Sequence, residues 1–93
     1  MVTVQFFSLL RLLLKRDKLE LPLEGEQTVG QLLQRIEQQL PAPILHKLLD
    51  CRGALHAGTI IMVNRRNILH LDGLDTTVLD GDTVALFPPG AGG

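Results

Sequence analysis

The stretch that decides the fold is TVGQLLQRIEQQL, residues 28–40, which carries the signature of one amphipathic helix. Thr28 followed three residues later by Gln31 makes a capping box, in which the two side chains bond each other's backbone N–H groups. Pro41 ends the helix. A single apolar stripe at spacings of three and four predicts that the helix lies on a sheet; its members are Val29, Leu32, Leu33, Ile36 and Leu40.

Strand-like alternation precedes the helix. Val2, Val4 and Phe6 alternate with polar residues, which predicts a strand with one buried face. Phe7 falls on the opposite side, so we expect this aromatic ring to point away from the main core. Residues 9–14, LLRLLL, lose the alternation and predict one or two helical turns, either buried or forming an additional contact surface.

Further strands are predicted on both sides of the helix. Residues 19–23 alternate again, and because Pro22 cannot donate to a ladder we expect this strand to lie at an edge of the sheet or to present that position outward. The segment 44–55 is ambiguous, although its leucines have helical spacing in part. After it we expect strands at residues 60–64 and 68–71, a turn at 65–67, a tight turn at 80–82 and a last strand at 83–87.

Two strands, a crossover helix and then more strands predict an α+β roll. Its mixed sheet has about five strands, one main helix packs across it, and the first and last strands pair in parallel at the centre. One domain covers residues 1–87, and residues 88–93 form a flexible C-terminal tail that ends in Gly-Gly.

Composition narrows the classes of function. A chain of 93 residues is too short for a large enzyme fold with its own cofactor site. A net charge of -1 gives no reason to expect nucleic-acid binding. One cysteine, Cys51, excludes an internal disulfide and a cysteine-rich zinc site. No apolar run approaches the roughly 20 residues of a membrane span, and the N-terminus is unlike a secretory signal, so we expect a soluble cytoplasmic domain.

The tail carries the strongest functional signal. Pro88 and Pro89 stiffen the exit from the last strand, and Gly90, Ala91, Gly92 and Gly93 follow with at most one methyl group each. Such a segment fits a narrow channel in another protein and presents one functional group there, the α-carboxylate of Gly93. Activation by an ATP-dependent partner would make that carboxylate reactive. The alternative is a loose chain end without a role.

The sequence resembles the small subunits of molybdopterin synthase (MoaD), within the MoaD/ThiS ubiquitin-like sulfur carriers. The segment LDTTVLDGDTVALFPP at residues 74–89, followed by Gly-Ala-Gly-Gly, is similar to the C-terminal signature of that family. Residues 4–11, VQFFSLLR, are similar to its first strand and following turn, and residues 28–33, TVGQLL, to its helix start. The resemblance implies the β-grasp (ubiquitin-like) fold.

The resemblance also implies that the protein acts as a co-substrate. On its own it would not be an enzyme, and it would hold no bound cofactor. An E1-like activating enzyme would adenylate Gly93, and a sulfurtransferase or cysteine desulfurase would supply the sulfur that turns this acyl-adenylate into a thiocarboxylate. The large synthase subunit, paired with the small one in a heterotetramer, would use that sulfur to make molybdopterin for the molybdenum cofactor. Gly90, Ala91 and Gly92 would thread the partner's active site.

Partner docking is implied for apolar residues near the root of the tail. Phe7, Ile68, Phe87, Pro88 and Pro89 fit these positions, although each has an alternative interpretation as a core or half-exposed residue. One departure from the family lies in the hairpin turn. Many relatives have Asn-Gly there, and Asn64-Arg65-Arg66 makes a two-residue primed turn less favoured.

Two rival functions stay open on the sequence alone. The same tail would serve a sulfur carrier of another pathway, such as thiamine thiazole synthesis, tRNA thiolation or ubiquitin-like conjugation. A β-grasp interaction module with an inert tail is the rival from a different class.

Other polar groups have ordinary interpretations. Cys51, His46 and His56 lack the ligand number of a closed zinc site and the third group of a nucleophilic site, so no metal site is expected. The aspartates between residues 72 and 82 lack the order of a calcium loop and fit turns instead. Arg65 and Arg66 form a basic cluster, either a solvated hairpin tip or a contact to an acidic partner.

Overall fold

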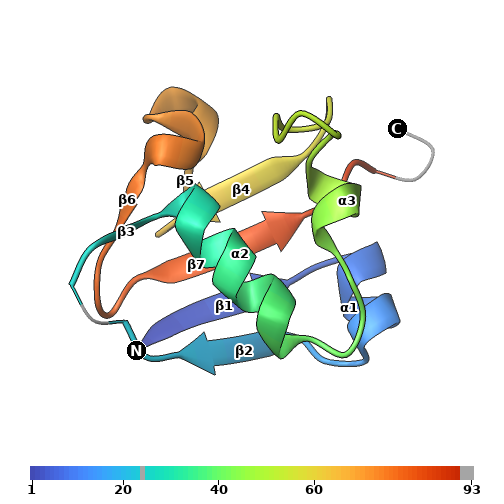
Figure 1. Ribbon diagram of the computed structural model, residues 1–93, viewed down its shortest axis with the longest axis horizontal. Helices are drawn as coiled ribbons and strands as arrows, with labels where there is room; N and C mark the ends of the chain where they lie inside the picture. The colour runs from blue at the N-terminus through green and yellow to red at the C-terminus, as the bar shows by residue number, and fades with distance from the viewer. Residues whose placement is uncertain (24, 91–93) are drawn as a thin grey trace.

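The computed structural model describes residues 1–23 and 25–90. Its strands are short and are interspersed with helices along the chain (Figure 1). In order they are β1 (Val2–Phe6), α1 (Leu9–Leu14), β2 (Lys18–Leu21), β3 (Gln27–Thr28), α2 (Val29–Gln39), α3 (Leu45–Leu48), β4 (Ile60–Val63), β5 (Arg66–Asn67), 3₁₀ turns at Ile68–His70 and Gly73–Asp75, β6 (Thr77–Val78) and β7 (Thr83–Phe87).

A mixed five-stranded sheet in the order β2-β1-β7-β4-β5 forms the body of the molecule. The first and last of these strands, β1 and β7, pair in parallel at its centre, and the other neighbours are antiparallel. The strand β2 lies at the edge, as Pro22 predicts. The main helix α2 crosses one face of the sheet (Figure 1), so the predicted α+β roll is confirmed.

The helix α2 begins and ends where the sequence places it. The hydroxyl of Thr28 accepts a hydrogen bond from the Gln31 N–H at 3.1 Å, and the Gln31 side chain accepts one from the Thr28 N–H at 3.0 Å. The four stripe residues within α2 are buried against the inward side chains of the strands, which removes their surface from water, and Leu40 after the helix is partly buried. The core between helix and sheet includes Val29, Leu32, Leu33, Ile36, Val2, Val4, Phe6, Ile61, Val84 and Leu86.

The short helix α1 settles the interpretation of residues 9–14. Leu10 and Leu14 are buried, whereas Leu9, Leu12 and Leu13 are exposed. The leucine run is therefore divided between the core and the surface, because positions four apart lie on the same side of a helix.

The segment after β5 differs from the prediction of a strand at residues 68–71. The chain forms a 3₁₀ turn at Ile68–His70, and the side chain of Asn67 caps it by accepting a hydrogen bond from the Leu69 N–H at 2.9 Å. A second unpredicted feature is a small ladder between β3 and β6, which ties the start of α2 to the loop before β7.

Within the described residues, no helix combines the length and the apolar character needed to cross a membrane.

Candidate functional site

The root of the C-terminal tail is packed more tightly than expected. Pro88 is buried, and Pro89 is half-buried. Pro89 lies close to Gly58, because a Cβ added to Gly58 would be 3.6 Å from Pro89. Gly90 is exposed, and nothing lies within 4 Å of where its Cβ would be. The domain boundary expected at residue 87 stays a prediction, and the two prolines that follow it are packed against the body.

Ala91, Gly92 and Gly93 lie outside the described residues. The roles predicted for them, threading a partner and carrying sulfur, therefore stay predictions.

Beside the tail root, two aromatic rings stack on the face of the sheet that α2 leaves open. The rings of Phe7 and Phe87 have centroids 4.3 Å apart and planes 8° from parallel. The register explains the contact, because Phe6 pairs with Leu86 in the parallel ladder and the next residue of each strand points to the opposite face. Both phenylalanines are half-buried, and Ile60, paired with Phe87, is 36% exposed. An apolar surface thus adjoins the point where the tail leaves.

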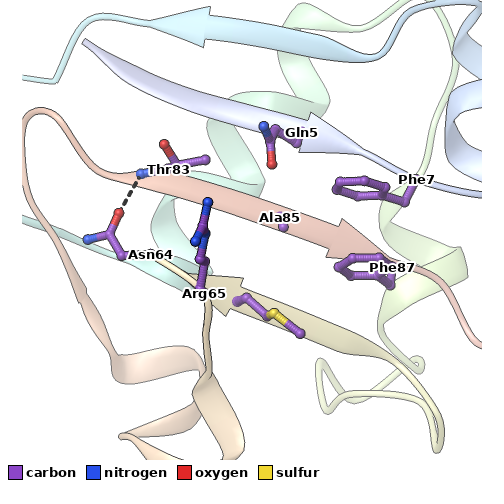
Figure 2. A pocket seen from close by; sticks show the side chains of 8 residues that line it. Gln5, Phe7, Asn64, Arg65, Thr83, Ala85 and Phe87 are labelled. Carbon is purple, nitrogen blue, oxygen red and sulfur yellow. Dashed lines mark hydrogen bonds between the residues drawn. The ribbon is translucent and has the colours of Figure 1, made fainter.

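A shallow hollow of about 480 Å³ extends from this stack along the open face (Figure 2). One part of its lining is apolar and the other is polar, so the hollow can contact both kinds of group. The apolar part consists of Phe7, Met62, Ala85 and Phe87, and the polar part of Gln5, Asn64, Arg65 and Thr83. Gln5 could have been found from the sequence, because the alternation that turns Phe7 outward turns Gln5 the same way.

The hairpin between β4 and β5 supplies the polar end of the hollow and corrects one prediction. Val63 pairs with Arg66, so the turn has two residues, and both Asn64 (φ 51°) and Arg65 (φ 70°) lie in the left-handed region, as in type I′ turns. The primed turn that the sequence disfavoured therefore forms.

Tertiary hydrogen bonds hold this turn. The Asn64 side chain accepts from the Thr83 N–H at 2.9 Å and donates to the Asp82 carboxylate at 2.8 Å (the first of these bonds is drawn in Figure 2). The Asn64 N–H also donates to the Thr83 carbonyl at 2.8 Å.

Two of the predicted docking residues do not lie on this surface. Ile68 is completely buried, because the 3₁₀ turn directs it into the core instead of along a strand. Pro88 is buried as well. The structure thus leaves Phe7 and Phe87 with exposed surface for docking, together with the half-buried Pro89.

The remaining polar groups of the sequence have structural surroundings. The His56 ring lies 2.9 Å from the His46 carbonyl oxygen, and Cys51 is exposed nearby. Hydrogen bonds from the N–H groups of Ala54 and Arg52 lower the pKa of Asp50 below its ordinary value. Among the described residues, no three His, Cys, Asp or Glu side chains are grouped as a metal site would require.

The aspartates near residue 80 stabilise turns, as expected. Asp82 accepts a hydrogen bond from the Leu79 N–H at 2.9 Å, and Asp80 pairs with the N-terminal amine of Met1. Gly81 between them has φ 92°, which a residue with a Cβ adopts only at a cost.

Two known proteins are similar to this chain in both sequence and length. Small archaeal modifier protein 3 of Haloferax volcanii is 30% identical over 90 residues, which cover 97% of this chain and 96% of the relative. A provisionally named sulfur carrier protein of Archaeoglobus fulgidus is 37% identical over 75 residues, covering 80% of this chain and 84% of the relative.

Solved structures show the same fold. SAMP1 from Haloferax volcanii has a TM-score of 0.82 at 24% identity, covering 99% of this chain and 98% of its own. A chain of the BexX/CysO complex from Amycolatopsis orientalis has a TM-score of 0.78 at 28% identity, with complete coverage of both chains. A provisionally named molybdopterin converting factor subunit 1 from Pyrococcus furiosus has a TM-score of 0.69 at 26% identity and covers 96% of this chain and 97% of its own. The expected β-grasp, ubiquitin-like fold is confirmed.

The family model of the ThiS family matches residues 4–93, almost the entire chain. The match includes the first strand, the helix and the tail from which the resemblance was drawn. The protein therefore belongs to the ThiS family, among the ubiquitin-like sulfur carriers and modifiers.

Proposed function

We propose that this protein is a sulfur carrier that reacts through the C-terminal carboxyl group of Gly93. An E1-like activating enzyme joins that carboxylate to AMP from ATP and releases pyrophosphate. A persulfide carried by a sulfurtransferase or cysteine desulfurase then displaces AMP and forms an acyl disulfide. A thiol cleaves the S–S bond of this acyl disulfide, which leaves the thiocarboxylate and a disulfide between the thiol and the sulfur donor. The protein is a co-substrate in these steps, and its covalent states are transient.

The observation that carries the proposal is the exposed position of Gly90 directly after the packed Pro88 and Pro89. The body holds the chain as far as Pro89, and nothing lies within 4 Å of where a side chain at Gly90 would begin. In an extended conformation four residues span roughly 13 Å, at about 3.3 Å each. That length carries a terminal carboxyl group from the surface of this domain into the interior of a neighbouring enzyme.

The apolar surface at the tail root supports the same conclusion. A protein that receives the tail must also contact the surface around the tail root. The stacked rings of Phe7 and Phe87 and the exposed Ile60 lie on that surface. Half-buried aromatic side chains beside a polar rim are typical of the central contacts of protein interfaces. We assign Phe7 and Phe87 to docking, with Pro89 at its edge.

For the fate of the sulfur we propose the synthesis of molybdopterin, with a large synthase subunit as the acceptor protein in a heterotetramer. Residues 74–93 support this assignment through their similarity to the small synthase subunits. The structural likeness to the Pyrococcus furiosus chain is in agreement, at a TM-score of 0.69.

A second candidate is a protein modifier, in which a lysine amine of another protein attacks the activated carboxyl group and forms an amide bond. The relative that favours it is the small archaeal modifier protein 3 of Haloferax volcanii, because its similarity covers 97% of this chain.

The deciding experiment is intact-mass measurement after incubation with ATP, a sulfide source and the activating enzymes of the source organism. We expect one oxygen of the protein to be replaced by sulfur. A variant with one alanine added after Gly93 is the matched control, because its body is unchanged while the reactive terminus is displaced. Loss of the mass change in the extended variant supports the carrier, whereas an unmodified wild-type protein with every activating enzyme refutes it.

The two fates of the activated protein are then separated by their products. Purified thiocarboxylate incubated with a large synthase subunit and the cyclic pyranopterin precursor should yield molybdopterin. Conjugates of higher mass that contain an amide bond between Gly93 and a lysine would identify a modifier instead.

A further inference from the structure

The hollow on the open face contains one charged group. Of the side chains that line it, Arg65 alone is ionised at neutral pH, and the others are apolar or neutral polar groups. In Figure 2 the Arg65 side chain extends from the hairpin over β7, at the end of the hollow opposite the stacked Phe7 and Phe87. The hollow therefore combines a cationic end with an aromatic end.

The smaller hollow on the other side of Phe7 adds to the positive rim. It has a volume of about 170 Å³, shares Gln5 and Phe7 with the first, and is also lined by Arg11, Lys18 and Asp17. Two basic groups thus accompany one acidic group there, which adds one net positive charge beside the aromatic stack. The Asp82 carboxylate near the first hollow is already bonded to the Asn64 side chain at 2.8 Å, whereas Arg65 is unpaired.

The guanidinium of Arg65 makes no ion pair and no hydrogen bond with the residues that the structure describes. Within residues 1–23 and 25–90, the one ion pair joins the Met1 amine to Asp80, and the side-chain hydrogen bonds of the hairpin come from Asn64. Arg65 also occupies a backbone position with φ 70°, where glycine is the residue that fits without strain. Arg65 thus combines a free cation with a left-handed backbone position at the rim of the hollow, and strained backbone positions cluster at functional sites.

We propose that this hollow binds a segment of a partner protein that presents a carboxylate to Arg65 and an apolar side chain to the Phe7–Phe87 stack. A guanidinium binds a carboxylate through two parallel hydrogen bonds, which fixes the orientation of the segment as well as its charge. The inference rests on the proposed function only in taking the partner to be a protein that receives the tail.

The test uses two synthetic peptides and the full chain labelled with ¹⁵N. The acidic peptide is acetyl-Glu-Leu-Phe-Glu-amide, and its matched counterpart replaces both glutamates by lysine. We expect saturable shifts of the amide signals of Phe7, Arg65, Ala85 and Phe87 with the acidic peptide, and binding about tenfold weaker with the basic one at low salt. Equal affinities, or the absence of saturable shifts at these residues in the millimolar range, overturn the inference.

Three variants separate the role of Arg65 from that of net charge and of folding. Arg65→Glu should reverse the preference between the peptides, whereas Arg66→Glu, with the same change of charge, should leave it intact. Arg66 pairs directly with the buried Val63, so its side chain lies on the other side of the sheet. Arg65→Gly should weaken binding of the acidic peptide without lowering the melting temperature. Equal effects of Arg65→Glu and Arg66→Glu refute a specific contact.

Failure of this inference is distinguishable from failure of the proposed function. The peptide titration requires no reaction at Gly93, and the formation of a thiocarboxylate requires no peptide. With an activating enzyme that modifies the wild-type protein, Arg65→Glu should raise the KM for the carrier and leave kcat nearly unchanged, because it removes a docking contact remote from the reacting carboxyl group.

Discussion

The hairpin turn offers a stability prediction in which neighbouring residues respond in opposite directions. At Arg65, with φ 70°, replacement by glycine removes the clash of a Cβ in the left-handed region, which costs about 1–2 kcal/mol. The greater freedom of glycine in the unfolded chain offsets about 0.4–1 kcal/mol of that gain. Arg65→Gly should therefore raise the free energy of unfolding by about 0.5–1 kcal/mol.

Asn64→Gly is the matched control, since Asn64 also has a positive φ, of 51°. Asparagine tolerates this conformation well, so little strain is relieved. Its side chain, however, bonds the Thr83 N–H and the Asp82 carboxylate at 2.9 Å and 2.8 Å. Each such bond contributes about 0.5–1.5 kcal/mol net, so this variant should lose about 1 kcal/mol or more.

The assay is thermal unfolding followed by far-UV circular dichroism, because the chain contains no Trp or Tyr for fluorescence. In a domain of this size 1 kcal/mol shifts the melting temperature by about 4–8 °C. Arg65→Gly should melt about 2–8 °C higher than the wild type, and Asn64→Gly at least about 4 °C lower. Destabilisation by Arg65→Gly would refute the reasoning, because it would mean that the arginine side chain holds the turn.

Three further predictions concern the face, the core and one loop. A double-mutant cycle with Phe7→Ala and Phe87→Ala, measured by urea unfolding, should give a coupling of about 0.5–1.5 kcal/mol for the stacked rings; additive effects would contradict the stack. Ile68→Ala should cost about 2–5 kcal/mol in the same assay, since its side chain is fully buried, and a loss below about 1 kcal/mol would place it on the surface. The Ala54 N–H lowers the pKa of Asp50 in the folded protein. The stability contributed by the ionised Asp50 carboxylate is therefore fully present above the pKa that Asp50 has in the unfolded chain, and it is lost as the pH falls through the lower pKa of the folded protein. Asp50→Asn should therefore flatten the fall in stability as the pH drops below the ordinary pKa of an aspartate, and an unchanged slope would exclude this contribution.

The helix and the central strands could be predicted because their signals are local. The capping box of Thr28 and Gln31 determines the start of α2, and the alternation in β1 and β7 gives their buried faces. The parallel pairing of the two strands was predictable from their order. The register that brings Phe7 onto Phe87 was not, because it depends on packing across the whole sheet.

The hairpin and the segment after it were mispredicted for reasons that the local sequence does not contain. Asn64 holds its turn through groups on residues 82 and 83, which are distant in the chain. Residues 68–71 have the apolar character of a strand, yet the Asn67 side chain caps the Leu69 N–H and the chain turns. That turn buries Ile68, which removes it from the docking surface. The polar end of the hollow follows from the same hairpin, so the sequence indicated the side chains of Gln5 and Arg65 but not that they share one hollow with the aromatic stack.

The tail continues directly from β7, which β1 and β4 flank on both sides. Traction on the C-terminus is therefore transmitted along the axis of that strand, at right angles to most of the bonds that hold it. Under such shear the bonds of both ladders resist together instead of opening one after another. Pulling β7 along its axis should therefore require more force than peeling a strand from an edge of the sheet.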